Sequence, residues 1–197
     1  MRFILASASA SRRALLMAAG VPFLAKPAEI DETKLKDELI AAGQKIEEIA
    51  GALAEAKALS VSRENAGALV LGADQALLFE GALISKCADM AGARALLKRL
   101  RGKTHRLSGG LALVRDGEVL WRHATLSTLT MRDFSDAFLE DYLEREGGDI
   151  LACVGCYRLE NLGAQLFDAI EGDYFSILGL SLLPLLAELR RQGIIAA

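Results

Sequence analysis

Long apolar runs and an excess of charge of one sign are both absent from this sequence. No apolar stretch reaches the roughly 18 residues of a membrane-spanning helix. The 197 residues carry 23 basic and 26 acidic side chains, for a net charge of −3. A protein that binds DNA or RNA mainly by charge would be strongly basic. We therefore expect no nucleic acid and no membrane among the partners.

Cysteine is also scarce, and the three residues are an odd number with no disulfide framework. Cys153 and Cys156 form a Cys-x-x-Cys, but Cys87 and the two histidines lack the spacing of further zinc ligands. A redox pair would begin a helix, whereas residues 152–157 are predicted to form a strand. Because a chain of 197 residues can bury roughly 70% of its unfolded surface, the core needs no disulfide or metal, and we expect buried, reduced thiols.

The N-terminus has too few apolar residues for a secretion signal. About four of them precede the first serine, against the 7–15 expected of a signal peptide, and Arg12 and Arg13 follow soon after. We therefore expect a cytoplasmic protein.

Helical and strand-like patterns alternate along the chain. Strands are predicted at residues 3–6 and 68–73 and beside 161–163 and 171–173, with hairpins turning at 80–81 and 116–117. Helices are predicted at residues 12–19, 46–62, 89–100, 135–146 and from about 181 to 193. This mixture predicts an α/β fold with a mixed sheet, in one domain spanning residues 1–197.

A serine-rich turn, Ser7-Ala8-Ser9-Ala10-Ser11, connects the first predicted strand to the first helix. Free N–H groups at a helix N-terminus bind phosphate, and serine hydroxyls add hydrogen bonds. Arg12 and Arg13 in the first turn oppose the helix dipole unless an anion lies there. The alternative is a plain helix cap with arginines in solvent.

Acidic and basic residues follow several of the predicted elements. Asp74 comes after the strand at 68–73, and Asp31 and Glu32 end another extended run; such carboxylates hold a metal ion or orient a water molecule. Lys57 and Lys86 could reach phosphates. Taken singly, each of these residues is as compatible with an ordinary solvated side chain.

Taken together and in this order, these motifs resemble the Maf family. The matching segments are Leu5–Leu16, Ile30–Glu32, Leu53–Ala58, Gly72–Gln75, Ile84–Cys87, Leu100–His105, Gly155–Gly163 and Ile177–Leu182. The family prolines are replaced by Ala10 and Cys87, which loosens two loops but removes no reactive group.

The resemblance implies a single two-lobed domain, with a long bent mixed sheet flanked by helices and a central cleft, as in Maf and inosine triphosphatase proteins. It implies hydrolysis of a nucleoside triphosphate to the monophosphate and pyrophosphate, by attack of water at the α-phosphorus with Mg²⁺ or Mn²⁺. It also implies a housekeeping role in nucleotide metabolism or cell division, and it is compatible with a homodimer.

Site residues follow by position in the Maf motifs. Asp74 would accept the proton of water, and Glu32 and Asp74 would bind the metal. Lys86 would bind substrate and contribute to catalysis. The remaining triphosphate-binding residues would be Ser7, Ser9, Arg12 and Lys57.

Three further positions vary with the preferred base in the Maf family, and they match Ser11, Gln75 and Glu160. A branch acting on dTTP and UTP has Arg, Thr and Gln there, and a branch acting on 7-methyl-GTP has Trp, Gln and Glu. Gln75 and Glu160 resemble the second branch, whereas Ser11 fits neither. The alternatives are a pyrimidine (dTTP, UTP or CTP) pyrophosphatase, and a nucleotide-binding cell-division regulator with little hydrolysis.

Overall fold

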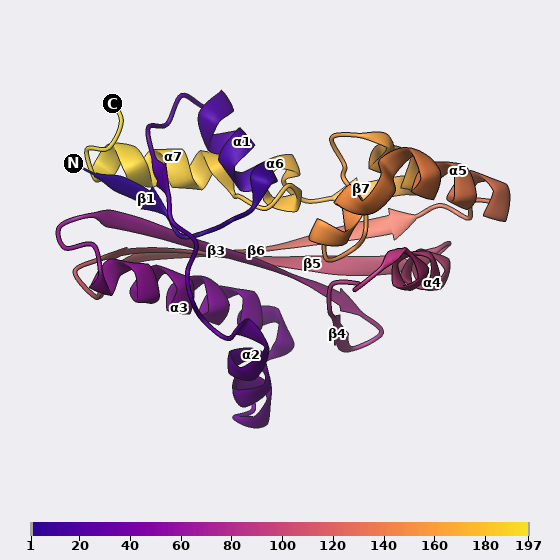
Figure 1. The fold of residues 1–197 in the computed structure, drawn as a ribbon, viewed down its shortest axis with the longest axis horizontal. Helices are drawn as coiled ribbons and strands as arrows, with labels where there is room; N and C mark the ends of the chain where they lie inside the picture. The colour runs from indigo at the N-terminus through magenta and orange to yellow at the C-terminus, as the bar shows by residue number, and fades with distance from the viewer. Residues whose placement is uncertain (1, 197) are drawn as a thin grey trace. The chain divides into compact units, whose positions relative to one another are not determined.

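The computed structural model describes residues 2–196 and shows helices on both sides of a mixed sheet (Figure 1). Its strands run in the order β2-β1-β3-β5-β6-β7, with β4 paired to β3. The strands are β1 (Phe3–Leu5), β2 (Leu24–Ala25), β3 (Leu69–Phe79), β4 (Ala82–Ile84), β5 (Thr104–Arg115), β6 (Glu118–Met131) and β7 (Phe167–Glu171). The α-helices are α1 (Ala10–Ala18), α2 (Glu32–Ala41), α3 (Ile49–Arg63), α4 (Met90–Leu100), α5 (Asp136–Glu146), α6 (Tyr174–Ile177) and α7 (Leu182–Arg191). The predicted α/β class with a mixed sheet is confirmed.

The described chain divides into two compact units. Unit 1 contains residues 2–75, 108–125 and 173–196, and unit 2 contains residues 76–107 and 126–172. Strands β3, β5 and β6 each supply residues to both units.

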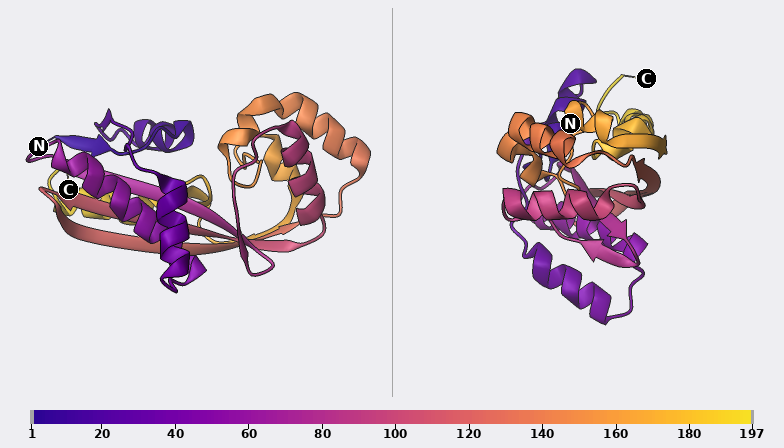
Figure 2. Two further views of the ribbon diagram at one scale, coloured as in Figure 1. Left: turned by 60° about the horizontal axis from the view of Figure 1, so that its bottom comes forward. Right: turned by 90° about the vertical axis from the view of Figure 1, so that its right-hand side faces the viewer.

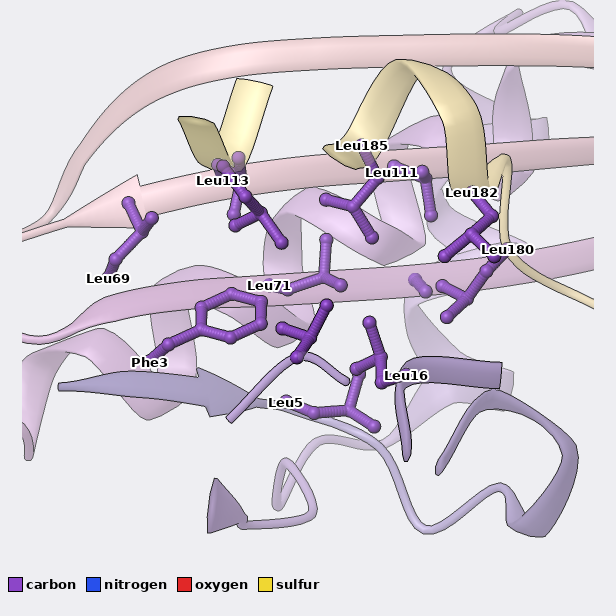
Figure 3. Close-up of a cluster of buried hydrophobic side chains, with 13 residues drawn as sticks. Phe3, Leu5, Leu16, Leu69, Leu71, Leu111, Leu113, Leu180, Leu182 and Leu185 are labelled. Carbon is purple, nitrogen blue, oxygen red and sulfur yellow. The ribbon is translucent and has the colours of Figure 1, made fainter. Parts of the chain in front are cut away.

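In unit 1, both faces of the sheet are buried, because apolar side chains on either side of each strand meet a helix. Strand β1 pairs in parallel with β2 and β3. Its alternate residues Phe3 and Leu5 join a core that includes Leu16 of α1 and Leu185 of α7 (Figure 3). Ile4 faces the other way, into a second cluster with residues of α3. Continuous apolar runs such as Phe3–Leu5 are typical of strands buried on both faces.

Helix α3 lies unusually close to the sheet because a glycine faces it. A Cβ atom at Gly72 of β3 would overlap the backbone carbonyl of Ala54 in α3. Gly110 of β5 makes a similarly close approach to Gly51 of α3. Glycine in a strand commonly marks such an approach, and here it fixes the distance between α3 and β3.

In unit 2, the end of β3 folds back through Glu80 and Gly81 onto β4, in the predicted hairpin. Glu80 and Gly81 have φ values of 51° and 78°, the left-handed conformation of a two-residue hairpin turn. Strand β7 pairs antiparallel with β6, and helices α4 and α5 pack against each other (Figure 2).

Two expectations about local structure were wrong, and one helix was not predicted. Helix α2 was not predicted, since its residues have almost no apolar face and none is buried. Residues 152–157 form turns rather than a strand, with Cys156 in the left-handed region at φ 54°. Beside Asn161 the chain forms a short 3₁₀ helix, Leu162–Leu166, so only the strand before Gly172 is confirmed. No helix among residues 2–196 is long and apolar enough to cross a membrane.

Candidate active site

Three charged side chains from unit 1 meet on the face of β3 that α3 covers. The Nζ atom of Lys57 lies 2.6 Å from Oδ1 of Asp74 and 2.8 Å from Oε2 of Glu32. The side chains of Lys57 and Asp74 are only 9% and 11% exposed, whereas that of Glu32 is 53% exposed. One buried ammonium group therefore bridges two carboxylates, and Glu32 connects this cluster to solvent.

The close contact between α3 and β3 explains why Lys57 reaches Asp74. Gly72 and Asp74 point to the same side of β3, because strand side chains alternate. Gly72 packs on Ala54, and Lys57 lies one helical turn further along the same face of α3. A larger residue at position 72 would push α3, and Lys57 with it, away from the carboxylate.

Asp74 lies inside a strand rather than at its end, which differs from the sequence prediction. Strand β3 continues to Phe79 because its second half pairs with β4. The neighbouring strand β1 ends at Leu5, level with Leu71, and the serine turn begins beyond that point. The strand whose carboxyl end lies beside the site, where a ligand is expected to bind, is therefore β1 rather than β3.

The serine turn caps α1 as predicted, although α1 begins at Ala10 rather than Arg12. The Ser9 hydroxyl accepts a hydrogen bond from the Arg12 backbone N–H and lies 3.0 Å from the Ser11 hydroxyl. The Ser7 hydroxyl accepts from the Ser9 backbone N–H at 3.2 Å. The turn thus places three hydroxyl groups at a helix N-terminus, where the dipole favours an anion.

Arg12 is more buried than a solvent-facing phosphate ligand would be. Its Nε atom donates to the Gly179 carbonyl at 3.0 Å, and Nη1 donates to the Ala73 carbonyl at 2.9 Å and to Ser7 Oγ at 3.1 Å. Burial lowers the pKa of Arg12, and the charges of Asp74 and Glu32 oppose that shift. Arg12 therefore ties the serine turn to β3 and to the segment before α7.

Gln75 points to the opposite side of β3 from Asp74. Its Nε2 atom donates to the carbonyls of Ser176 and Ile177 at 3.0 and 3.1 Å, at the end of α6. With the amide nitrogen held in this way, its carbonyl oxygen is fixed as a hydrogen-bond acceptor.

The remaining predicted site residues, Lys86 and Glu160, belong to unit 2, whereas Asp74 belongs to unit 1. Lys86 lies exposed in the loop between β4 and α4, and Glu160 lies exposed in a turn. The Glu160 turn is held by a charge network that the sequence analysis missed. Arg158 pairs with the buried Glu146 at 2.6 Å, and Glu146 accepts the Leu162 backbone N–H at 3.1 Å.

The described residues contain no group of three histidine, cysteine or acidic side chains that could hold a metal ion by themselves. Mg²⁺ in phosphoryl-transfer sites is usually held by one or two carboxylates together with substrate phosphates and water. Asp74 and Glu32, directed at one cationic group, fit that smaller donor set. A shallow depression of about 480 Å³ along α2, lined by Asp31 and Asp37 among others, includes neither Asp74 nor Lys57.

Comparison with known proteins agrees with the motifs. The sequence pattern described as Maf-like protein matches residues 2–192. A 7-methyl-GTP pyrophosphatase of Brucella abortus is 47% identical over 191 residues, covering 97% of this chain and 96% of that protein. A protein of the same name from Mesorhizobium japonicum is 50% identical over 194 residues, covering 98% of both.

A nucleoside triphosphate pyrophosphatase of Granulibacter bethesdensis is 48% identical over 192 residues, again covering 98% of both chains. The similarity therefore extends through the serine turn, the Lys57 helix and Asp74 rather than through one motif. Because the family match covers nearly the whole chain and these relatives are 47–50% identical to it, the protein belongs to the Maf family.

Proposed function

We propose that the protein hydrolyses a nucleoside triphosphate to the monophosphate and pyrophosphate. The observation that carries the proposal is the buried Lys57–Asp74 pair with Glu32 beside it. The serine turn lies next to this pair and caps the N-terminus of α1, a place where helices commonly bind phosphate. The names of the Brucella and Granulibacter relatives support the same reaction. Hydrolysis of this kind is the cleavage of a phosphoric anhydride.

In the proposed reaction, Asp74 accepts the proton of the attacking water. Lys57 holds Oδ1 of Asp74 in place, which leaves Oδ2 to take the proton. Burial excludes competing solvent from a carboxylate that must be oriented for this step. A divalent cation, Mg²⁺ or Mn²⁺, would be held by Asp74 and Glu32 and would neutralise charge on the phosphate oxygens.

The triphosphate would bind at the serine turn. Ser7, Ser9 and the free N–H groups of α1 supply hydrogen bonds, and Lys86 supplies positive charge toward the pyrophosphate leaving group. Arg12 contributes mainly by holding this turn rigid, since Nε and Nη1 are occupied by protein acceptors. Within residues 2–196, Nη2 of Arg12 donates to no protein acceptor, so this nitrogen is available to a phosphate oxygen.

The preferred base would be 7-methylguanine, read by Gln75 and Glu160. A carboxylate at position 160 can accept hydrogen bonds from N1–H and the 2-amino group of guanine together, and it favours a cationic methylated purine. Two relatives are named for 7-methyl-GTP. Ser11 is too small to stack on a base, so discrimination would be weaker than with an aromatic residue there.

Pyrophosphate release from the purified protein tests this proposal, with Mg²⁺ or Mn²⁺, across the common nucleoside triphosphates and deoxynucleoside triphosphates and 7-methyl-GTP. Release fastest with 7-methyl-GTP supports both the reaction and the base. Release fastest with UTP, CTP or dTTP supports the reaction and overturns the base assignment. Tight nucleotide binding without release would favour a regulator over an enzyme.

A further inference from the structure

The side-chain amide of Gln75 in unit 1 is held in one orientation. Its Nε2 atom donates to the carbonyl oxygens of Ser176 and Ile177 at 3.0 and 3.1 Å. Exchanging the two amide atoms would set Oε1 against two oxygen atoms, so the nitrogen must face these carbonyls. Oε1 meets no donor among residues 2–196, and Gln75 is only half-buried. This oxygen therefore stays an open hydrogen-bond acceptor.

The two carbonyls belong to α6, a single helical turn that needs support from outside, because helices this short are unstable by themselves. The exposed Asp173 carboxylate supplies that support. Its Oδ2 atom accepts hydrogen bonds from the backbone N–H of Ser176 at 2.7 Å and from the Ser176 hydroxyl at 2.6 Å. The Ser176 hydroxyl also lies 2.9 Å from that of Ser181, and both serines are buried. One carboxylate thus caps α6 and holds Ser176.

The chain beyond α6 is fixed by the apolar core. Leu180 belongs to the same buried cluster as Leu71 of β3 (Figure 3). The backbone N–H of Leu180 donates to the Phe175 carbonyl at 3.1 Å, which ties the end of α6 to this anchor. The core therefore fixes one end of α6, and Asp173 holds the other. Because Asp173 is exposed, it can be replaced without disturbing the core.

We propose that Asp173 is a positioning residue for base recognition: through α6 it holds Gln75 as a hydrogen-bond acceptor that selects the 2-amino group of a guanine base. The proposal rests on the function proposed above and names the group of the base that Gln75 reads. A fixed acceptor gains a hydrogen bond from an N–H and repels a carbonyl oxygen. The 2-amino group carries two N–H bonds, so one remains for Gln75 when a carboxylate takes the other.

The contact is tested with two nucleotides that differ only in the 2-amino group, 7-methyl-GTP and 7-methyl-ITP. Their α,β-methylene forms cannot release pyrophosphate, so isothermal titration calorimetry with Mg²⁺ measures Kd whether or not the protein is an enzyme. The full-length proteins are the wild type, Asp173→Ala, Asp173→Asn, Gln75→Leu and the double variant of Asp173→Ala with Gln75→Leu. In Asp173→Asn the amide oxygen can still accept from Ser176. Asp168→Ala on the exposed surface of β7 is the control for loss of one carboxylate.

The wild type should bind the 7-methyl-GTP analogue up to about tenfold more tightly than the 7-methyl-ITP analogue, as expected for one hydrogen bond. Asp173→Ala should reduce this ratio to about two- to threefold, because α6 loosens and the Gln75 amide turns. Asp173→Asn and Asp168→Ala should keep the wild-type ratio. The double variant should show the ratio of Gln75→Leu alone, since Asp173 acts through Gln75. A general loosening of the fold would instead weaken both nucleotides alike.

Equal affinity of the wild type for the two analogues, or an unchanged ratio in Asp173→Ala, would overturn the proposal. Pyrophosphate release from unmodified 7-methyl-GTP separates this outcome from a failure of the proposed function. Release together with an unchanged ratio would uphold hydrolysis and refute the positioning role. The expected ratios without any release would uphold the base contact and refute hydrolysis. A protein that binds neither analogue would refute both.

Discussion

The Lys57 ammonium group determines the charge balance around the carboxylates of Asp74 and Glu32. Two acids directed at the same buried point would repel each other, and a buried charge without a partner is costly. Lys57 offsets both effects through its contacts with Asp74 and Glu32. The cluster is therefore stable without substrate, and Lys57 keeps the Asp74 carboxylate in a fixed orientation.

Replacing Asp74 by Asn should leave the fold and nucleotide binding intact, because the amide has nearly the same shape. Turnover should fall at least about a hundredfold, as expected for the loss of a general base. Steady-state kinetics measures the turnover, and circular dichroism checks that the fold is intact. Asp168→Asn, on the exposed surface of β7, is the control and should be fully active. Wild-type-like turnover of Asp74→Asn would remove Asp74 from its proposed role.

Replacing Glu160 by Gln should shift substrate preference toward UTP and dTTP. The amide can donate a hydrogen bond to the carbonyl oxygens of uracil and thymine, which a carboxylate cannot do. The ratio of kcat/KM between 7-methyl-GTP and UTP measures the shift. Glu144→Gln, an exposed change on α5, should leave that ratio unaltered. If both variants rank substrates as the wild type does, Glu160 does not read the base.

His105 should make the protein less stable in mild acid. Its pKa is lowered from 6.5 to about 4, because burial beside Tyr157 disfavours the charged ring. The unfolded chain therefore binds a proton first as the pH falls. Stability is unaffected above about pH 6.5 and declines between about pH 6.5 and 4, by at most about 3 kcal/mol in all.

Urea unfolding near pH 7.5 and near pH 5 measures this loss, which should be smaller in His105→Gln than in the wild type. His123→Gln is the comparison, because His123 is only half-buried. An equal loss of stability in the wild type and in His105→Gln would contradict the prediction.

Among secondary-structure elements, the contact between α3 and β3 matters most for the site. Gly72→Ala should destabilise the protein by about 1–3 kcal/mol, since the added methyl overlaps the Ala54 carbonyl and α3 must shift. Activity should fall as well, because Lys57 moves with the helix. Thermal unfolding and pyrophosphate release check both effects.

Gly51→Ala is a matched control on the same helix. A Cβ at Gly51 meets no atom within 4 Å, so the change should stabilise α3 by about 0.5–1 kcal/mol. If the Gly72→Ala and Gly51→Ala variants unfold at the same midpoint temperature, the close approach of α3 to β3 does not limit the stability of the protein.

At the scale of the whole molecule, we expect apolar packing to supply most of the stability. In unit 1 the sheet is buried on both faces, and the cysteines are free. Removing divalent cations with EDTA should therefore abolish pyrophosphate release while leaving the midpoint of thermal unfolding unchanged. Restoring Mg²⁺ should restore activity. A lower midpoint in EDTA would indicate that a metal ion also holds the fold.

Much of this architecture could be predicted from local sequence patterns. The buried strand at Phe3–Leu5, the hairpin turns at Glu80-Gly81 and Asp116-Gly117, and the Ser135 cap of α5 depend on alternation, turn conformation and capping, which neighbouring residues determine. Helix α2 was not predicted, because none of its residues is buried and its sequence therefore lacks a periodic apolar pattern. Residues 152–157 were misread because Gly155 and the left-handed Cys156 interrupt an otherwise strand-like composition.

The sequence by itself determined the fold class, the family and the identity of Asp74, Glu32 and Lys57 as candidates, because these follow from ordered motifs and local patterns. Only the tertiary structure decided that Lys57 bridges both carboxylates and that Arg12 is occupied by backbone carbonyls. Each of these contacts joins residues far apart in the chain. Packing of a helix on a strand, or of one loop on another, brings them together, and no local pattern carries that information.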